Sequence, residues 1–201
     1  MTTPAFALNY DYRCPFARIM HEHLVLALRS GAAFDVTFEP FTLSQGHVAP
    51  DATPVWDDPS YDGDLLALET SVAVRDAFPD HFLDLHAAFF TARHEEGNSL
   101  RSRSQVDPIV TAVGLDPEAV AELVATGAAR REIAEIWTKR TSIDQVFGVP
   151  TFFVADQAVF VRYMERPTED AAASVTLIER LVDMVANQPA INEFKHTTLP
   201  R

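Results

Sequence analysis

The chain has 201 residues, of which 47% are hydrophobic and 22% are charged, a composition typical of a folded globular protein. Its formal net charge of −13 argues against nucleic-acid and anionic-membrane partners, because phosphate-rich surfaces select basic proteins. The single cysteine excludes an internal disulfide and a cysteine-based zinc cluster. No signal-peptide pattern or membrane-length apolar run is present, so we expect a cytoplasmic protein. Arginine outnumbers lysine and alanine is abundant, which favours a bacterial source.

The first predicted elements are a strand, a tight junction and a helix. Apolar residues alternate over 6–10, which predicts the strand, and a helical pattern follows from Pro15 to Ser30. Cys14 stands at the expected N-cap, because proline suits the first helical position. Free amides and the helix dipole at that end would lower the thiol pKa. The alternative is a buried, inert cysteine.

A second strand is predicted over 34–41, where apolar and polar residues alternate again. It would run parallel to the first strand, because a long helical crossover joins the two. A loop follows over 45–59, and helical patterns then continue to about residue 144. These helices have the following expected starts: Asp64, a cap at Asp80, a capping box at Ser104–Asp107, a cap at Asp116, and a break at Gly127.

The last part of the chain predicts two strands and a helix. The strands cover 146–154 and 158–163, with a turn at Asp156–Gln157, and together they would form a hairpin. Asp170 would cap the final helix. The complete order is therefore strand, helix, strand, a helical block, then strand, strand and helix.

Two motifs in this order resemble a known family: Asp11-Tyr-Arg-Cys14-Pro15-Phe16-Ala17 and Gly148-Val149-Pro150-Thr151-Phe152-Phe153-Val154. The order resembles the thioredoxin fold, and the helical block between its halves resembles the DsbA-like superfamily. The chain looks closest to a cytoplasmic bacterial branch of that superfamily. Related proteins are the 2-hydroxychromene-2-carboxylate isomerases, the kappa-class glutathione transferases and the mycothiol-dependent reductases.

The resemblance implies an α/β protein with a thioredoxin-like fold and a helical insertion between its βαβ and ββα halves. The thioredoxin-like domain would comprise 5–44 and 146–187, and the helical insertion domain would comprise 60–145. A C-terminal tail would cover 188–201.

The resemblance also implies a site. Cys14 would be the nucleophile, Pro150 a cis-proline opposite it, and the backbone of Val149 would pair with a bound thiol or peptide. We expect these residues to bind the substrate or thiol: Pro15, Phe16, Ala17, Arg18, Val149, Pro150 and Thr151. No metal and no tightly bound cofactor is expected.

Ala17 departs from the family's Cys-x-x-Cys pattern, because it stands where the second cysteine would be. A mixed disulfide at Cys14 would therefore need an external thiol to resolve it. This favours a monothiol thiol-disulfide oxidoreductase that uses mycothiol or glutathione and acts on small-molecule or protein disulfides. The alternatives are a kappa-class-like transferase or isomerase and a non-catalytic thioredoxin-fold binding module.

Three further groups of side chains are weaker candidates. Arg13 and Arg18 flank Cys14 and would either lower its pKa or hold a carboxylate of a small thiol, although solvated arginines are the simpler interpretation. The histidines lack the i, i+4 spacing of a helical metal pair, although one of them, His86, would suit a groove between insertion and core. They are His21, His23, His81, His86 and His94. An aromatic wall and four basic spots complete the set: Tyr10, Tyr12, Phe16 and Trp56, and Arg101, Arg103, Arg130 and Arg131.

Overall fold

The computed structural model describes residues 5–193, 195, 196 and 198. Within them a four-stranded sheet has the order β2-β1-β3-β4. Its strands are β1 (Ala5–Tyr10), β2 (Asp35–Pro40), β3 (Thr151–Val154) and β4 (Gln157–Phe160). β1 and β2 are parallel, whereas β3 is antiparallel to both β1 and β4. The parallel crossover and the later hairpin are confirmed.

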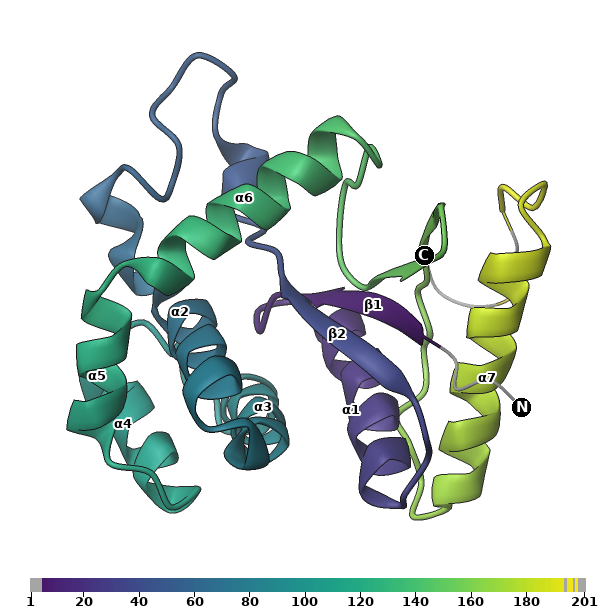
Figure 1. Ribbon diagram of the computed structural model, residues 1–201, viewed down its shortest axis with the longest axis horizontal. Coiled ribbons are helices and arrows are strands. Elements are labelled where there is room, and N and C mark those ends of the chain that lie inside the picture. Colours follow the sequence, from purple (N-terminus) through teal and green to yellow (C-terminus); the bar gives the residue numbers. More distant parts are fainter. Residues whose placement is uncertain (1–4, 194, 197, 199–201) are drawn as a thin grey trace.

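Two helices alternate with the strands of the thioredoxin-like part, and five helices are inserted between β2 and β3. The first two are α1 (Pro15–Arg29) and α7 (Ala171–Asn187), which pack against each other. The inserted helices are α2 (Asp62–Ala77), α3 (Pro79–His94), α4 (Arg103–Ala112), α5 (Pro117–Ala125) and α6 (Ala128–Ser142). Two 3₁₀ turns precede them, η1 (Gln45–His47) and η2 (Pro59–Tyr61). The inserted helices gather beside the β2 edge of the sheet, and α7 lies on the far side (Figure 1).

The core joins both parts of the chain. Leu8 in the central strand β1, Met20 in α1 and Ile178 in α7 are fully buried, and Leu65 and Phe89 are equally buried in the inserted helices. Burial of each such side chain contributes about 1.5–3 kcal/mol. Among the described helices, none combines the length and the hydropathy needed to cross a membrane.

Three predicted helix starts in the insertion are wrong. Helix α2 begins at Asp62, two residues before the predicted Asp64. Helix α3 begins at Pro79, so Asp80 lies in its first turn instead of capping it. Proline fits the first helical position without losing a hydrogen bond, so the helix starts earlier in the chain than predicted. Helix α4 begins at Arg103 with Ser102 as N-cap, so Ser104 lies inside the helix and no capping box forms.

The predicted hairpin strands are too long. β3 begins at Thr151, because Pro150 has no N–H to extend the ladder. The turn consists of Ala155 and Asp156, one residue earlier than predicted, and Ala155 has a left-handed φ of 52°. β4 therefore begins at Gln157 and ends at Phe160. In the predicted tail, the described residues form no helix or strand, and 194, 197 and 199–201 lie outside the described residues.

The cap of α7 gives a first prediction. Asp170 accepts hydrogen bonds from the amides of Ala172 and Ala173, as its predicted capping role requires. We expect Asp170→Ala to lower the free energy of unfolding by about 1 kcal/mol in urea titrations. Glu169→Ala, at the exposed neighbouring position, should change it by less than about 0.5 kcal/mol. Equal losses in the two variants would contradict the assigned cap.

Candidate active site

Cys14 is the N-cap of α1, directly after the end of β1, and Pro15 occupies the first helical position as predicted. The amide of Ala17 donates to Cys14 Sγ over 3.5 Å. The thiol itself donates to the carbonyl oxygen of Val149 over 3.3 Å. With 8% of its surface exposed, the side chain is nearly covered. The resting sulfur is therefore a protonated thiol held between the helix end and the loop before β3.

The thiol pKa is shifted in the direction opposite to our expectation. Burial raises the pKa of Cys14 above its ordinary value of 9.0, and the nearby Asp11 carboxylate adds to the rise. The amides of Ala17 and Phe16 and the charge of Arg162 lower the pKa, but burial outweighs them. The helix end does point at the sulfur. Its effect is smaller than the cost of moving a thiolate out of water.

A second prediction follows from this shift. We expect iodoacetamide alkylation of native Cys14 to titrate at a higher pH than alkylation of the same cysteine in the urea-unfolded chain. The Arg162→Gln variant should move the native midpoint higher still, because it removes a stabilising charge. Mass spectrometry of samples quenched at successive pH values measures both midpoints. If the alkylation midpoint of the native protein lay at a lower pH than that of the unfolded chain, Cys14 would be an activated thiol after all.

The loop opposite Cys14 is held by a buried asparagine. The Val149–Pro150 peptide bond is cis, the isomer that the resemblance implied. Asn9 Nδ2 donates to the carbonyl of Gly148 over 3.3 Å, and Asn9 Oδ1 accepts from the amide of Thr151 over 2.6 Å. Because Asn9 is fully buried, these two bonds fix both flanks of the loop.

Large apolar side chains are exposed on the segment between α6 and the cis-proline loop. Phe147 and Ile143 are 79% and 70% exposed, and the ring of Phe147 packs against that of Phe160. The Arg162 guanidinium lies 4.9 Å from the centre of the Phe16 ring. Exposed apolar groups of this size are typical of surfaces that bind other molecules.

Comparisons with known proteins agree with this geometry. A family model, the DSBA-like thioredoxin domain, matches residues 67–166. Pseudomonas aeruginosa DsbA is similar in structure, with 18% identity, a TM-score of 0.59, and coverage of 94% of this chain and 85% of that one. The chain has a DsbA-like thioredoxin fold.

Two further solved structures share the fold. The thiol-disulfide exchange protein alpha-DsbA2 from Wolbachia pipientis is 16% identical, with a TM-score of 0.60 and coverage of 90% of this chain and 81% of that one. A putative protein disulfide isomerase from Nitrosomonas europaea is 12% identical, with a TM-score of 0.59 and coverage of 90% and 99%. A search of curated protein sequences gave no match. At these identities the structural likeness establishes the fold of the DsbA-like chain.

The two arginines that flank Cys14 are committed to carboxylates. Arg13 pairs with Asp11 over 2.6 Å and with Asp64 over 3.3 Å. Arg18 pairs with Glu22 over 2.7 Å and also contacts Glu95. They are therefore paired rather than simply solvated, and their binding of a thiol carboxylate stays a prediction. The arginine whose charge reaches Cys14 is Arg162, about 150 residues away along the chain and unmarked by any local pattern.

The other weak candidates also have structural partners. Three of the four basic spots form ion pairs: Arg101 with Asp64, Arg103 with Asp107 and Glu118, and Arg130 with Asp62 and Glu69. Arg131 donates to the carbonyl of Thr126. Tyr10 and Tyr12 are buried in the core, so they do not line an exposed wall, whereas Phe16 and Trp56 are partly exposed.

A buried chain of hydrogen bonds joins the insertion to the active-site strand. Tyr12 Oη lies 2.8 Å from His86 Nδ1, His86 Nε2 lies 2.9 Å from His21 Nδ1, and His21 Nε2 lies 3.1 Å from the carbonyl oxygen of Asn9. We call Tyr12, His86, His21 and Asn9 the histidine relay. Both histidines are fully buried, and His86 does lie between insertion and core. The side chain of the last member, Asn9, holds the loop opposite Cys14.

The hydrogen bonds of the histidine relay all run in one direction, from the Tyr12 hydroxyl to the Asn9 carbonyl. A carbonyl oxygen only accepts, so His21 Nε2 must carry the proton and His21 Nδ1 must accept from His86. His86 Nδ1 then accepts from the Tyr12 hydroxyl. Both rings are neutral, in agreement with burial that lowers the pKa of His21 to about 4 and that of His86 well below 6.5.

The remaining candidate histidines each bind one or two partners. His23 contacts Ser174 Oγ and the carbonyl of Glu165, His81 contacts the carbonyl of Val113, and His94 contacts the carbonyl of Tyr12. Among the described residues, no three His, Cys, Asp or Glu side chains gather as a metal ion would require.

Proposed function

We propose that the DsbA-like chain catalyses thiol-disulfide exchange through Cys14 alone, with an external low-molecular-weight thiol as second reactant. The supporting observation is the position of Cys14, at the start of α1 and 3.3 Å from the Val149 carbonyl, with alanine at position 17. A bound disulfide would meet both the sulfur and the backbone of the loop. A reducing compartment would supply the free thiol, in line with the cytoplasmic expectation.

The exchange needs two balanced steps. Cys14 loses its proton to solvent, and the thiolate attacks one sulfur of a disulfide. That S–S bond breaks as the new bond to Cys14 forms, and the other sulfur leaves as a thiolate. An external thiolate then attacks the substrate sulfur of the mixed disulfide. A new disulfide forms between these two sulfurs, and Cys14 leaves as a thiolate. Ala17 contributes its N–H to the sulfur, but no side chain that can resolve the intermediate.

A second function is favoured by the raised pKa of Cys14. A thiol that stays protonated can donate to the sulfur of a bound thiolate, as it now donates to Val149. In that role the residue would position glutathione or a similar thiol for a transferase or isomerase reaction, without forming a disulfide. This function uses the same small thiol and the same site as the first one. The difference is that Cys14 donates a hydrogen bond instead of forming a disulfide.

The deciding experiment compares the wild type with Cys14→Ser. Intact mass spectrometry after incubation with 2-hydroxyethyl disulfide should show one adduct on the wild type, and added glutathione should remove it. Cys14→Ser should form no adduct and should lose all exchange activity. If the wild type forms no adduct, while both forms bind glutathione, the second function replaces the first. A stable protein partner captured without any thiol dependence would instead favour a binding module.

A further inference from the structure

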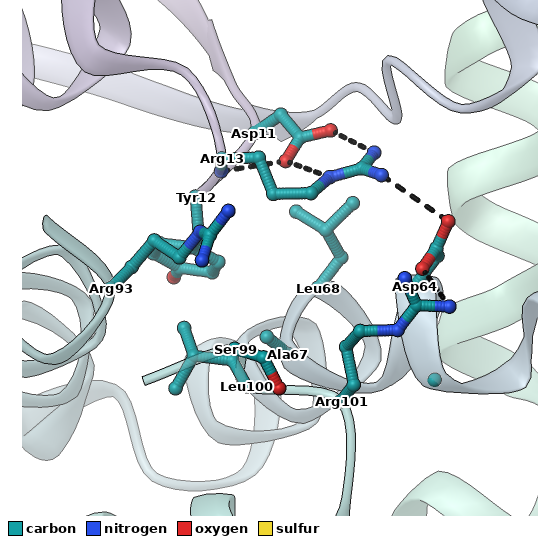
Figure 2. A pocket seen from close by; sticks show the side chains of 11 residues that line it. Asp11, Tyr12, Arg13, Asp64, Ala67, Leu68, Arg93, Ser99, Leu100 and Arg101 are labelled. Carbon is teal, nitrogen blue, oxygen red and sulfur yellow. Dashed lines mark hydrogen bonds and ion pairs between the residues drawn. The ribbon is translucent and has the colours of Figure 1, made fainter. Parts of the chain in front are cut away.

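A small cavity lies beside the segment that leads into Cys14. It is formed by residues 11–13, the first turns of α2 and the segment after α3, and its volume is about 20 Å³. That is room for one water-sized group, such as the oxygen of a carboxylate. Arg93 and Arg101 reach toward it from different segments (Figure 2). We call this cavity the Arg93 pocket.

The acidic groups of the pocket are already neutralised. Asp11 accepts from Arg13 through both oxygens and from the amide of Leu43. Asp64 accepts from Ser44 and Arg13 at one oxygen, and Arg101 lies 2.8 Å from the other. Two carboxylates are thus shared by two guanidinium groups.

Arg93 is the third arginine of the pocket, and it has no carboxylate partner there. It is partly buried, its guanidinium points into the pocket, and no dashed line joins it to a neighbour in Figure 2. Among the described residues it has no hydrogen-bonding or ion-pairing partner. The other described arginines that are buried or partly buried all pair with carboxylates: Arg13, Arg18, Arg75, Arg130 and Arg140.

A second, larger cavity offers a contrast. A cavity of about 260 Å³ lies between α1 and α3, and two arginines stand at its rim. Arg29 contacts Asp84, and Arg166 pairs with Glu22 and Glu95. Its cations are therefore paired within the protein, whereas Arg93 has no such partner in the part of the chain that the structure describes.

We propose that the Arg93 pocket binds a carboxylate of the small thiol that reacts at Cys14. This inference rests on the proposed thiol chemistry. Arg93 would donate to the one carboxylate oxygen that the pocket has room for, and exposed Arg101 would close the rim. The pocket borders Asp11–Arg13, the residues directly before Cys14 in the chain, so a carboxylate bound there would belong to a ligand that extends along this segment toward the nucleophile. The site then selects a carboxylated thiol of the glutathione type over a sugar-linked thiol without a carboxylate.

The test uses S-methylglutathione, which cannot form a disulfide, and its diester, in which both carboxylates are blocked. Calorimetry should show wild-type binding of S-methylglutathione and binding of the diester that is weaker by about ten-fold or more. Arg93→Gln should weaken S-methylglutathione binding by a similar factor and bind both ligands alike. Arg93→Lys should fall between the two, because it keeps the charge but not the planar fork.

Arg180→Gln is the matched control, because Arg180 is exposed on α7, far from the pocket, and its loss changes net charge equally. It should bind as the wild type does. The proposal is overturned if wild type binds neither ligand, if the diester binds equally, or if Arg93→Gln binds normally. Adduct formation with 2-hydroxyethyl disulfide, which has no carboxylate, judges the exchange activity separately. If binding depends on Arg93 but no adduct forms, the carboxylate site is supported and the proposed exchange activity is rejected.

Discussion

The Ala17→Cys substitution is expected to shorten the life of a mixed disulfide at Cys14 by about ten-fold or more. A thiol at position 17 would lie one helical turn from Cys14, since the Ala17 amide is already 3.5 Å from the sulfur. Residues with this separation are within the reach of a disulfide. The intermediate would then resolve inside the chain, with release of the bound thiol and formation of an internal disulfide.

Mass spectrometry separates the two outcomes. After reaction with 2-hydroxyethyl disulfide, the wild type should retain its adduct, and Ala17→Cys should pass to an internal disulfide without added thiol. Ala17→Ser controls for size, since its hydroxyl cannot resolve the adduct. Because Ala17 is fully buried, both variants should lose about 1–3 kcal/mol of stability. An adduct that persists equally in all three proteins would contradict the expected geometry.

The second large effect concerns the histidine relay at acidic pH. An unfolded histidine gains a proton near pH 6.5, whereas folded His21 stays neutral down to about pH 4. The unfolded state therefore binds more protons, and the free energy of unfolding falls as the pH drops from 6.5 toward 4. His21 alone accounts for about 3 kcal/mol of this loss, since a tenfold change in acidity corresponds to about 1.4 kcal/mol.

Urea titrations between pH 7.5 and about 4 measure this dependence. His86→Leu leaves the Tyr12 hydroxyl and His21 Nδ1 without partners, so we expect a loss of about 2–6 kcal/mol at neutral pH. Its curve should also fall less steeply with acid, because one buried neutral histidine is gone. His47→Leu, at an exposed position, should reproduce the wild-type slope. A wild-type slope in His86→Leu would show that His86 is not held neutral.

The features that could be predicted from the sequence are local ones. The Cys14–Pro15 junction and the cap at Asp170 depend on neighbouring residues, so short motifs were sufficient to locate them. The capping box at Ser104 failed because Arg103 had already started the helix. Such one-residue choices are decided by packing rather than by the motif.

The energetics of the site could not be predicted from the sequence, because they depend on tertiary contacts. The pKa of Cys14 depends on how completely other segments cover it, and burial outweighed the helix end that the motif revealed. His21 and His86 are 65 residues apart, so spacing within one helix could not pair them. Nothing in the sequence marked Asn9 as a residue of the site, and nothing distinguished Arg93 from the other arginines.

The Arg93 pocket also depends on a residue that has no side chain. Gly63 lies in the first turn of α2, where a Cβ atom would come 2.9 Å from the carbonyl oxygen of Arg101. Any larger residue must displace that backbone and, with it, the arginine at the rim. A glycine at this position, together with an arginine at position 93, is therefore a readable marker in related sequences. Relatives that carry both should prefer carboxylated thiols, and relatives that have lost the glycine should show a wider, less selective mouth.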